Sequence, residues 1–370
     1  CIGINSYAQN DVEIGNDPEL RKKEAEKAKN SPNIIDVTDN IFMLKGMGGN
    51  ITVHYGIDGV LMIDTKFEKS SEAILDIIED KTKLPLEFII NTHGHGDHTG
   101  GNKSFKRNGA TIIAHENTRN MMLSNMYKSA EQQILASLEK DIDEARQSEN
   151  SGDKLNAMEE SREQLIARMK EEATENVEID HEMLPAIAFK NDMLFHYNDE
   201  DIKLKHLSNA HTKGDITVYF PKSNLIHTGD AFVNKMYPFI DTENGGSYKG
   251  YQKGLTYIMN RANKDTKIIP GHGDLANKVD VAEMRQMMKI FYDKVSIAYM
   301  TNKTEDEVAK MRDFSKRYDD MGYGDGFITT EKFLRSVYKA VAKDLRAKKE
   351  ASEKRGKALK EAQKKLNGGR

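Results

Sequence analysis

The sequence contains one cysteine, no tryptophan and only 7 prolines among its 370 residues. Because the single cysteine is Cys1, no internal disulfide and no thiolate metal site is expected inside the fold. Any metal site must therefore use histidine and carboxylate side chains. Aromatic residues make up 7% of the chain, with no basic groove of interleaved aromatics, which argues against a nucleic-acid partner.

Long apolar segments are also missing. No run reaches the roughly eighteen apolar residues that a membrane-spanning helix needs. The formal net charge of -4 is too small to indicate a nucleic-acid or membrane partner. A charged share of 31% beside a hydrophobic share of 38% is typical of a compact body that carries long, solvated helices.

Composition and residue patterns along the chain suggest three regions. Residues 1–32 are polar and are interpreted as an N-terminal extension or tether. Residues 33–290 alternate strand and helix patterns, which predicts an α/β domain. Within it, residues 117–180 show only helical spacing and are interpreted as an inserted helical hairpin, whose second arm contains Leu155, Met158, Leu165 and Met169. Residues 291–370 are interpreted as a helical C-terminal extension.

The predicted elements follow from periodicity and turn signals. Strands are expected at 41–44, 51–55, 60–63, 86–90, 202–207, 216–220, 225–226 and 267–269. Helices are expected at 18–29, 70–81 and 255–262, and through most of the chain after Val281, with 327–341 as its most amphipathic piece. The glycine-rich stretch 45–50 lies between two strands and is interpreted as a hairpin turn rather than a phosphate-binding loop.

The strongest chemical signal directly follows the apolar strand 86–90. Within six residues the chain places His93, His95, Asp97 and His98, separated by Gly94 and Gly96. Packing does not explain such a density of polar side chains, whereas imidazoles and carboxylates are the ligands that divalent metals such as zinc prefer. The small glycines allow these side chains to converge, and ligand sites of α/β sheets lie beyond the carboxyl ends of strands.

Three further residues repeat the same pattern of a strand followed by a ligand. His211, Asp230 and His272 each lie close behind an apolar strand, the last two directly after glycine. With the first loop they make seven candidate ligands, about the number that a pair of catalytic metal ions needs besides a shared water. The sequence therefore predicts a two-metal site.

These motifs, in this order, resemble the metallo-β-lactamase superfamily, and the match covers about residues 33–290. The resemblance implies an αββα sandwich of two facing sheets with helices outside. It also implies that His93, His95 and His211 hold one metal, that Asp97, His98 and His272 hold the other, and that Asp230 bridges them. The best-known β-lactamases carry cysteine where this chain has Asp230, so the aspartate resembles the thioesterase, lactonase and phosphodiesterase branches instead.

The function expected on this basis is that of a zinc-dependent hydrolase. A hydroxide bridging two divalent metal ions, zinc with iron or manganese as alternatives, would attack an ester, lactone, thioester or β-lactam carbonyl. Asp97, His98 and Asp230 are the predicted catalytic residues. The alternatives are a phosphodiesterase or nuclease of the same superfamily and a metal-binding envelope protein without catalysis.

The expected partner is a small-molecule substrate, without nucleic acid. A chain that begins with Cys1 resembles a mature bacterial lipoprotein, which would place it in the cell envelope or periplasm with a lipid tether, the alternative being the cytoplasm. Lys213 and Lys235 are candidates for binding an anionic substrate group. Candidates for lining the substrate pocket are Asn50, Tyr237 and Tyr248.

Overall fold

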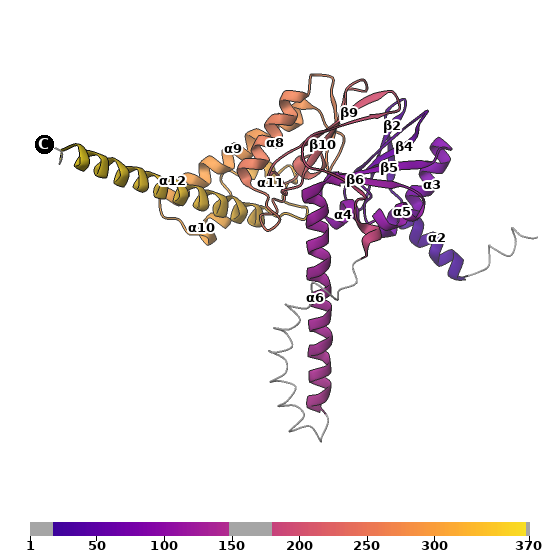
Figure 1. Ribbon diagram of the computed structural model, residues 1–370, viewed down its shortest axis with the longest axis horizontal. Coiled ribbons are helices and arrows are strands. Elements are labelled where there is room, and N and C mark those ends of the chain that lie inside the picture. The colour runs from indigo at the N-terminus through magenta and orange to yellow at the C-terminus, as the bar shows by residue number, and fades with distance from the viewer. Residues whose placement is uncertain (1–17, 148–179, 368–370) are drawn as a thin grey trace, which may run out of the picture. The chain divides into compact units, whose positions relative to one another are not determined.

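The computed structural model describes residues 18–147 and 180–367 and has a mixed α/β architecture with two sheets and helices (Figure 1). The chain divides into two compact units, each described below by itself. The first contains Cys1–Ser31 and Gly59–Lys190, and the second contains Pro32–Asp58 and Asn191–Arg370. In the part of the chain described, no helix is both long and apolar enough to cross a membrane.

The first unit is built on four parallel strands. In spatial order they are β4 (Gly59–Ile63), β5 (Leu86–Asn91), β6 (Thr111–His115) and β7 (Ile187–Phe189). All five residues of β4 are buried, as is usual for strands of a parallel sheet that is covered on both faces. Because the strands are parallel, the segments that follow β4 and β5 leave the same edge of the sheet.

Helices connect these strands. They are η1 (Glu68–Ser70), α3 (Ser71–Thr82), α4 (Gly96–Thr99) and α5 (Asn102–Arg107). Helix α3 buries Ile74 and Ile78, which are four residues apart and therefore share one face. It ends at Lys83, whose φ of 55° terminates the helix in a left-handed turn.

Two further helices belong to the first unit. Helix α2 (Pro18–Asn30) lies against α3, where Lys27 forms ion pairs with Glu72 and Asp76. Helix α6 (Glu116–Gln147) starts directly after β6 and runs away from the strands as one long rod (Figure 1). It is the first arm of the predicted helical insertion. The second arm, with Leu155, Met158, Leu165 and Met169, lies outside the described residues.

The second unit contains two sets of strands. Its antiparallel strands β1 (Asn33–Thr38), β2 (Ile41–Lys45) and β3 (Ile51–Gly56) include the predicted hairpin at residues 45–50. Its five-stranded sheet consists of β8 (Met193–Tyr197), β9 (Glu200–His206), β10 (Ile216–Phe220), β11 (Leu225–His227) and β12 (Lys267–Ile269). Pairing is antiparallel from β8 to β11, and β12 lies parallel to β11.

Helices make up most of the remaining second unit. They are η3 (Gly229–Ala231), α8 (Tyr248–Arg261), α9 (Lys278–Met300), α10 (Glu305–Ala309), α11 (Lys316–Asp319) and α12 (Thr330–Asn367). An aromatic core joins α9 to α12, since the Phe291 and Phe333 ring centroids lie 5.1 Å apart and Tyr237 stacks on Phe333 at 4.6 Å. Beyond this core α12 continues as a long helix that is mostly exposed as far as residue 361 (Figure 1).

The elements differ from the predicted ones in a few places. Strands β1, β6, β7 and β8 are additional to the expected ones; β6 is a buried apolar run, whereas β1, β7 and β8 have exposed or alternating burial patterns. Helix α8 starts seven residues before the predicted Leu255, at the Ser247 N-cap. The predicted helix at 327–341 begins only at Thr330, so Phe327 lies in the preceding loop and is 77% exposed.

One core residue of the second unit, His54 on β3, is a polar side chain that is fully buried without a hydrogen-bond partner for either ring nitrogen among the described residues. Its ring packs edge-on against Phe220, with centroids 5.3 Å apart. Burial lowers the pKa of His54 to about 4, although the negative charge of Glu200 acts to raise it. The imidazole is therefore neutral in the folded protein at neutral pH.

We predict that His54 makes the protein less stable in acid. Between pH 6.5 and about 4 the unfolded chain binds a proton at His54 that the folded chain excludes. The free energy of unfolding therefore falls as the pH falls, by about 1.4 kcal/mol per pH unit from this group. In His54→Leu this contribution disappears, which urea unfolding at pH 7 and pH 5 measures.

His196→Leu is the matched control, because His196 is exposed and paired with Asp201. An equal loss of stability between pH 7 and pH 5 in wild type and His54→Leu would contradict the prediction.

Candidate functional site

The loop after β5 gathers the first four predicted ligands. His93 and His98 are almost fully buried, and the His93 ring centroid lies 4.9 Å from that of His95 and 4.3 Å from that of His98. Asp97 Oδ2 lies 3.7 Å from His98 Nε2. The three imidazoles and the carboxylate therefore form one cluster at the carboxyl end of the strand, as the sequence predicted.

Glycines make this cluster sterically feasible. A Cβ on Gly100 would lie 2.6 Å from the Gly96 carbonyl oxygen, and one on Gly101 would lie 2.7 Å from that of Thr65. Real Cβ atoms do not approach backbone this closely, so both positions require glycine. The short helix α4 can thus fold back against the segment that follows β4.

That neighbouring segment supplies a residue that the sequence reasoning missed. Asp64 is fully buried directly after β4, and its Oδ2 lies 2.7 Å from His98 Nδ1. The Thr92 backbone N–H and hydroxyl both donate to the same carboxylate, each at 2.7 Å. Asp64 thereby fixes the ring of His98 with Nε2 toward Asp97, so Nε2 is the nitrogen that could hold a metal ion.

Lys66 is the second unexpected group of this segment. It is fully buried and has a φ of 54°, an uncommon backbone conformation for a residue other than glycine. Burial lowers the pKa of Lys66 to about 8, whereas the carboxylates of Asp97 and Asp64 act to raise it. A cationic amine at this place offsets part of the negative charge of the two aspartates.

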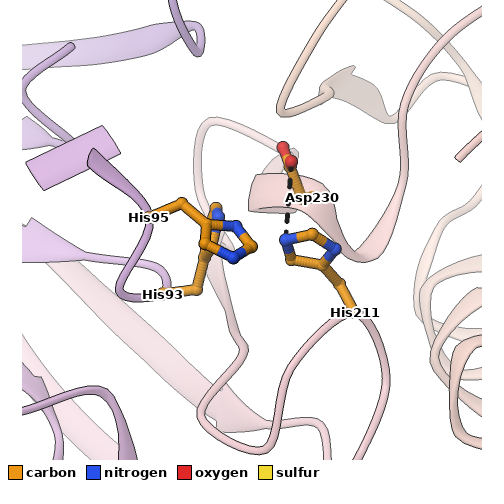
Figure 2. A group of neighbouring side chains, drawn as sticks. All are labelled: His93, His95, His211 and Asp230. Atoms are coloured by element: carbon orange, nitrogen blue, oxygen red, sulfur yellow. Dashed lines mark ion pairs between the residues drawn. The ribbon is translucent and has the colours of Figure 1, made fainter. Parts of the chain in front are cut away.

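The remaining predicted ligands lie together in the second unit. His211 is fully buried, its Nδ1 lies 2.8 Å from the Phe239 carbonyl oxygen, and its Nε2 lies 3.6 Å from Asp230 Oδ2. Figure 2 draws this ion pair as a dashed line, with the His93 and His95 side chains of the first unit. His272 Nε2 lies 3.4 Å from the other Asp230 oxygen, Oδ1. Asp230 is thus flanked by one imidazole on each carboxylate oxygen.

Side chains from neighbouring loops hold these three residues. Asp215 accepts hydrogen bonds from the backbone N–H and the hydroxyl of Thr212, which shapes the turn after His211. Burial raises the pKa of Asp215 to about 8, while the Thr212 hydrogen bonds act to lower it. Asn50 donates its amide to the carbonyls of Pro270 and Gly273, on either side of His272.

Other candidates from the sequence have structural roles. Tyr237 and Tyr248 are both buried and donate their hydroxyls to Asp319 and to the Met288 carbonyl, respectively. Asn50, the third candidate, supports the His272 loop as described above. Lys213 and Lys235, the candidates for binding an anionic group, are both exposed.

The donor set fits divalent metal ions. In His98 and His211 the Nδ1 atom is engaged by Asp64 and by a carbonyl, so Nε2 of each faces a carboxylate. The distances from Nε2 to carboxylate oxygen are 3.4–3.7 Å, too long for hydrogen bonds. Two ligands that share a tetrahedral ion at about 2.1 Å are separated by about 3.4 Å. Each half of the site therefore has the spacing of ligands around a common cation.

Comparisons with known proteins agree with this chemistry. The sequence model of the Metallo-beta-lactamase superfamily matches residues 44–272, which include all seven predicted ligands. An alkyl/aryl-sulfatase of Saccharomyces cerevisiae is 32% identical over 73 residues, 19% of this chain and 11% of that protein. The chain therefore spans only a small part of the length of this relative.

Solved structures share the fold at low sequence identity. A metallo-beta-lactamase from Pontibacter korlensis is 14% identical, with a TM-score of 0.50 over 70% of this chain and 99% of that one. A stereoselective inverting sec-alkylsulfatase from Pseudomonas sp. is 16% identical, with a TM-score of 0.56 over 85% of this chain and 50% of that one. Since the family match covers more than half of the sequence, the chain belongs to the metallo-beta-lactamase superfamily.

Proposed function

We propose that this protein is a hydrolase with two divalent metal ions. The ions would be held jointly by two half-sites, the cluster at residues 93–98 and the group of His211, Asp230 and His272. His93, His95 and His211 would hold one ion, Asp97, His98 and His272 the other, and Asp230 would bridge them. The observation that carries the proposal is the orientation of His98 and His211 by Nδ1 partners, with Nε2 facing a carboxylate in each half-site. Bound zinc ions would supply a water whose pKa is lowered toward about 7.

The protein residues around the ions would perform three tasks. Asp97, only partly exposed, would accept a hydrogen bond from the attacking water and fix its direction. Asp64 would keep His98 in the tautomer that ligates through Nε2. Lys66, behind Asp97 and Asp64, would limit the build-up of negative charge when substrate binds. The attacked centre would be the carbonyl of an ester, lactone, thioester or β-lactam.

A second candidate substrate is a sulfate ester. It is favoured by the sequence match to an alkyl/aryl-sulfatase, which extends over 73 residues. A phosphodiester remains a further alternative, since the same donor set serves phosphoryl centres equally well. A panel with p-nitrophenyl acetate, an acyl lactone, a glutathione thioester, a β-lactam, an alkyl sulfate and bis-p-nitrophenyl phosphate separates these classes.

We predict that the purified protein binds two zinc ions per chain and needs them for hydrolysis. Elemental analysis measures the ratio, and removal by a chelator followed by the substrate panel measures the dependence. Bound metal also stabilises the folded state, by about 4 kcal/mol when free metal exceeds its dissociation constant a thousandfold. Calorimetry of the metal-free and reloaded protein tests this. Bound metal without turnover of any substrate would favour a metal-binding protein instead.

We predict that Asp230→Asn reduces the metal content to one ion per chain. Asn offers one oxygen where the carboxylate offers two, and Asp230 faces both His211 and His272. Hydrolysis should fall by more than about a hundredfold, the upper range for loss of a residue that merely supports a ligand. Full activity with a single bound metal would contradict the two-metal proposal.

We predict that Asp64→Asn weakens metal binding by roughly ten- to a hundredfold, because the His98 ring loses its carboxylate partner. Competition with a chromophoric chelator measures the affinity. Asp201→Asn is the matched control, because Asp201 forms an exposed His–Asp pair of the same 2.7 Å length with His196. Equal affinities of the two variants would show that Asp64 does not support a ligand.

A further inference from the structure

Two exposed aromatic side chains lie beside the predicted ligand His211. Phe239 is 40% exposed and Phe327 is 77% exposed, and their rings meet edge-to-face with centroids 5.9 Å apart. The Phe239 ring also packs against the His211 ring at 5.8 Å, and its carbonyl oxygen lies 2.8 Å from His211 Nδ1. We call the pair Phe239 and Phe327 the aromatic shelf. It is an apolar surface in direct contact with a predicted metal ligand.

The shelf is held in place by a partly buried network. Phe239 follows Tyr237 by two residues, and the Tyr237 backbone N–H donates to the Tyr323 carbonyl in the loop that carries Phe327. The hydroxyls of Tyr237 and Thr330 both donate to Asp319 Oδ1, at 2.9 and 2.6 Å. Both ends of the loop 320–329 are thereby fixed to the segment that supports His211.

Phe327 also contacts Lys332, on α12. The Lys332 amine lies 5.2 Å from its ring centroid and donates a hydrogen bond to its carbonyl oxygen at 3.4 Å. A cation over one face leaves the other parts of the ring available to an apolar ligand. Exposed apolar groups gathered beside a polar centre are typical of ligand-binding surfaces.

We propose that the aromatic shelf binds the apolar alkyl, acyl or aryl group of the substrate while the scissile group lies at His211. The assignment rests on the proposed hydrolase function. We assign the shelf to a group of the substrate because Phe239 contacts His211 through both its ring and its carbonyl oxygen. Substrates with a chain of several carbons are therefore preferred over short ones.

Two measurements test the preference. Calorimetric titration of the zinc-loaded protein with butyrate and octanoate measures binding, and kcat/KM for p-nitrophenyl butyrate and octanoate measures turnover. A fully buried methylene is worth roughly a fourfold change in affinity, and a half-open shelf roughly half of that free energy. Octanoate, with four more methylenes, should therefore bind about fifteenfold more tightly than butyrate, and the longer ester should be favoured to a similar degree.

The matched variants are Phe327→Ala, Phe327→Leu and Ile297→Ala. Phe327→Ala should reduce the octanoate preference to about twofold, whereas Phe327→Leu should retain most of it. Ile297 on α9 is 56% exposed, so Ile297→Ala controls for the loss of an exposed apolar side chain. Since Phe327 makes little buried contact, Phe327→Ala should fold normally, which its melting temperature confirms.

The outcomes separate the two proposals. The proposed role of the aromatic shelf is contradicted if Phe327→Ala leaves the preference for octanoate unchanged. It is also contradicted if both acids bind equally well. Self-association of the wild type that Phe327→Ala abolishes, with no change in chain-length preference, also overturns it and assigns the shelf to a contact between copies. If no ester is hydrolysed but octanoate binding depends on Phe327, the shelf stands and the proposed hydrolase function fails.

Discussion

The candidate site depends on the orientation of buried imidazoles. An imidazole can ligate a metal through either nitrogen, and the free energy of fixing one tautomer must come from the surrounding protein. In this chain His98 is fixed by the Asp64 carboxylate and His211 by the Phe239 carbonyl. His93 Nδ1 lies 3.1 Å from the hydroxyl of Thr92, which also donates to Asp64. One buried carboxylate therefore influences two imidazoles of the first half-site.

Close backbone approach is the second requirement, because the ligand loops are packed too tightly for side chains at several positions. A Cβ on Gly271 would lie 2.0 Å from Asp230 Oδ1, and one on Gly246 would lie 2.0 Å from the His211 carbonyl oxygen. His272 and His211 can thus approach Asp230 only because these neighbours are glycine. The oriented imidazole rings and the glycines, which lack side chains, together account for the close spacing of the residues in each half-site.

The sequence pointed to the candidate ligands but not to the residues that support them. The seven candidates were recognisable because histidine and aspartate recur behind apolar strands, most densely at 93–98. Asp64 carries the same signal, a carboxylate directly after the apolar strand β4, but a lone aspartate at a strand end is indistinguishable from a turn residue. Lys66 was not found either, because nothing in its sequence context indicates that a lysine is buried.

The same limit applies to tertiary packing. Short, β-branched apolar runs predicted β10 and β12 with their observed bounds, because residues buried in a sheet determine the local pattern. Tyr237 was expected in a substrate pocket, since it follows Asp230 closely in the sequence. Its burial depends instead on Phe333 in α12, almost a hundred residues later, and no local pattern contains that information.

The helices after residue 290 are therefore part of the architecture of the site. Asp319 accepts hydrogen bonds from Tyr237 and Thr330, so it connects the loop before α12 to the segment that supplies the carbonyl partner of His211. Residues of the loop 320–329 can change the surface beside His211 without altering any ligand or its support. Because a metal-ligand set requires fixed geometry and the loop does not, the proposed function separates two roles: Phe327 would set the substrate preference, whereas Asp64, Asp230 and the glycines would maintain the geometry of the half-sites.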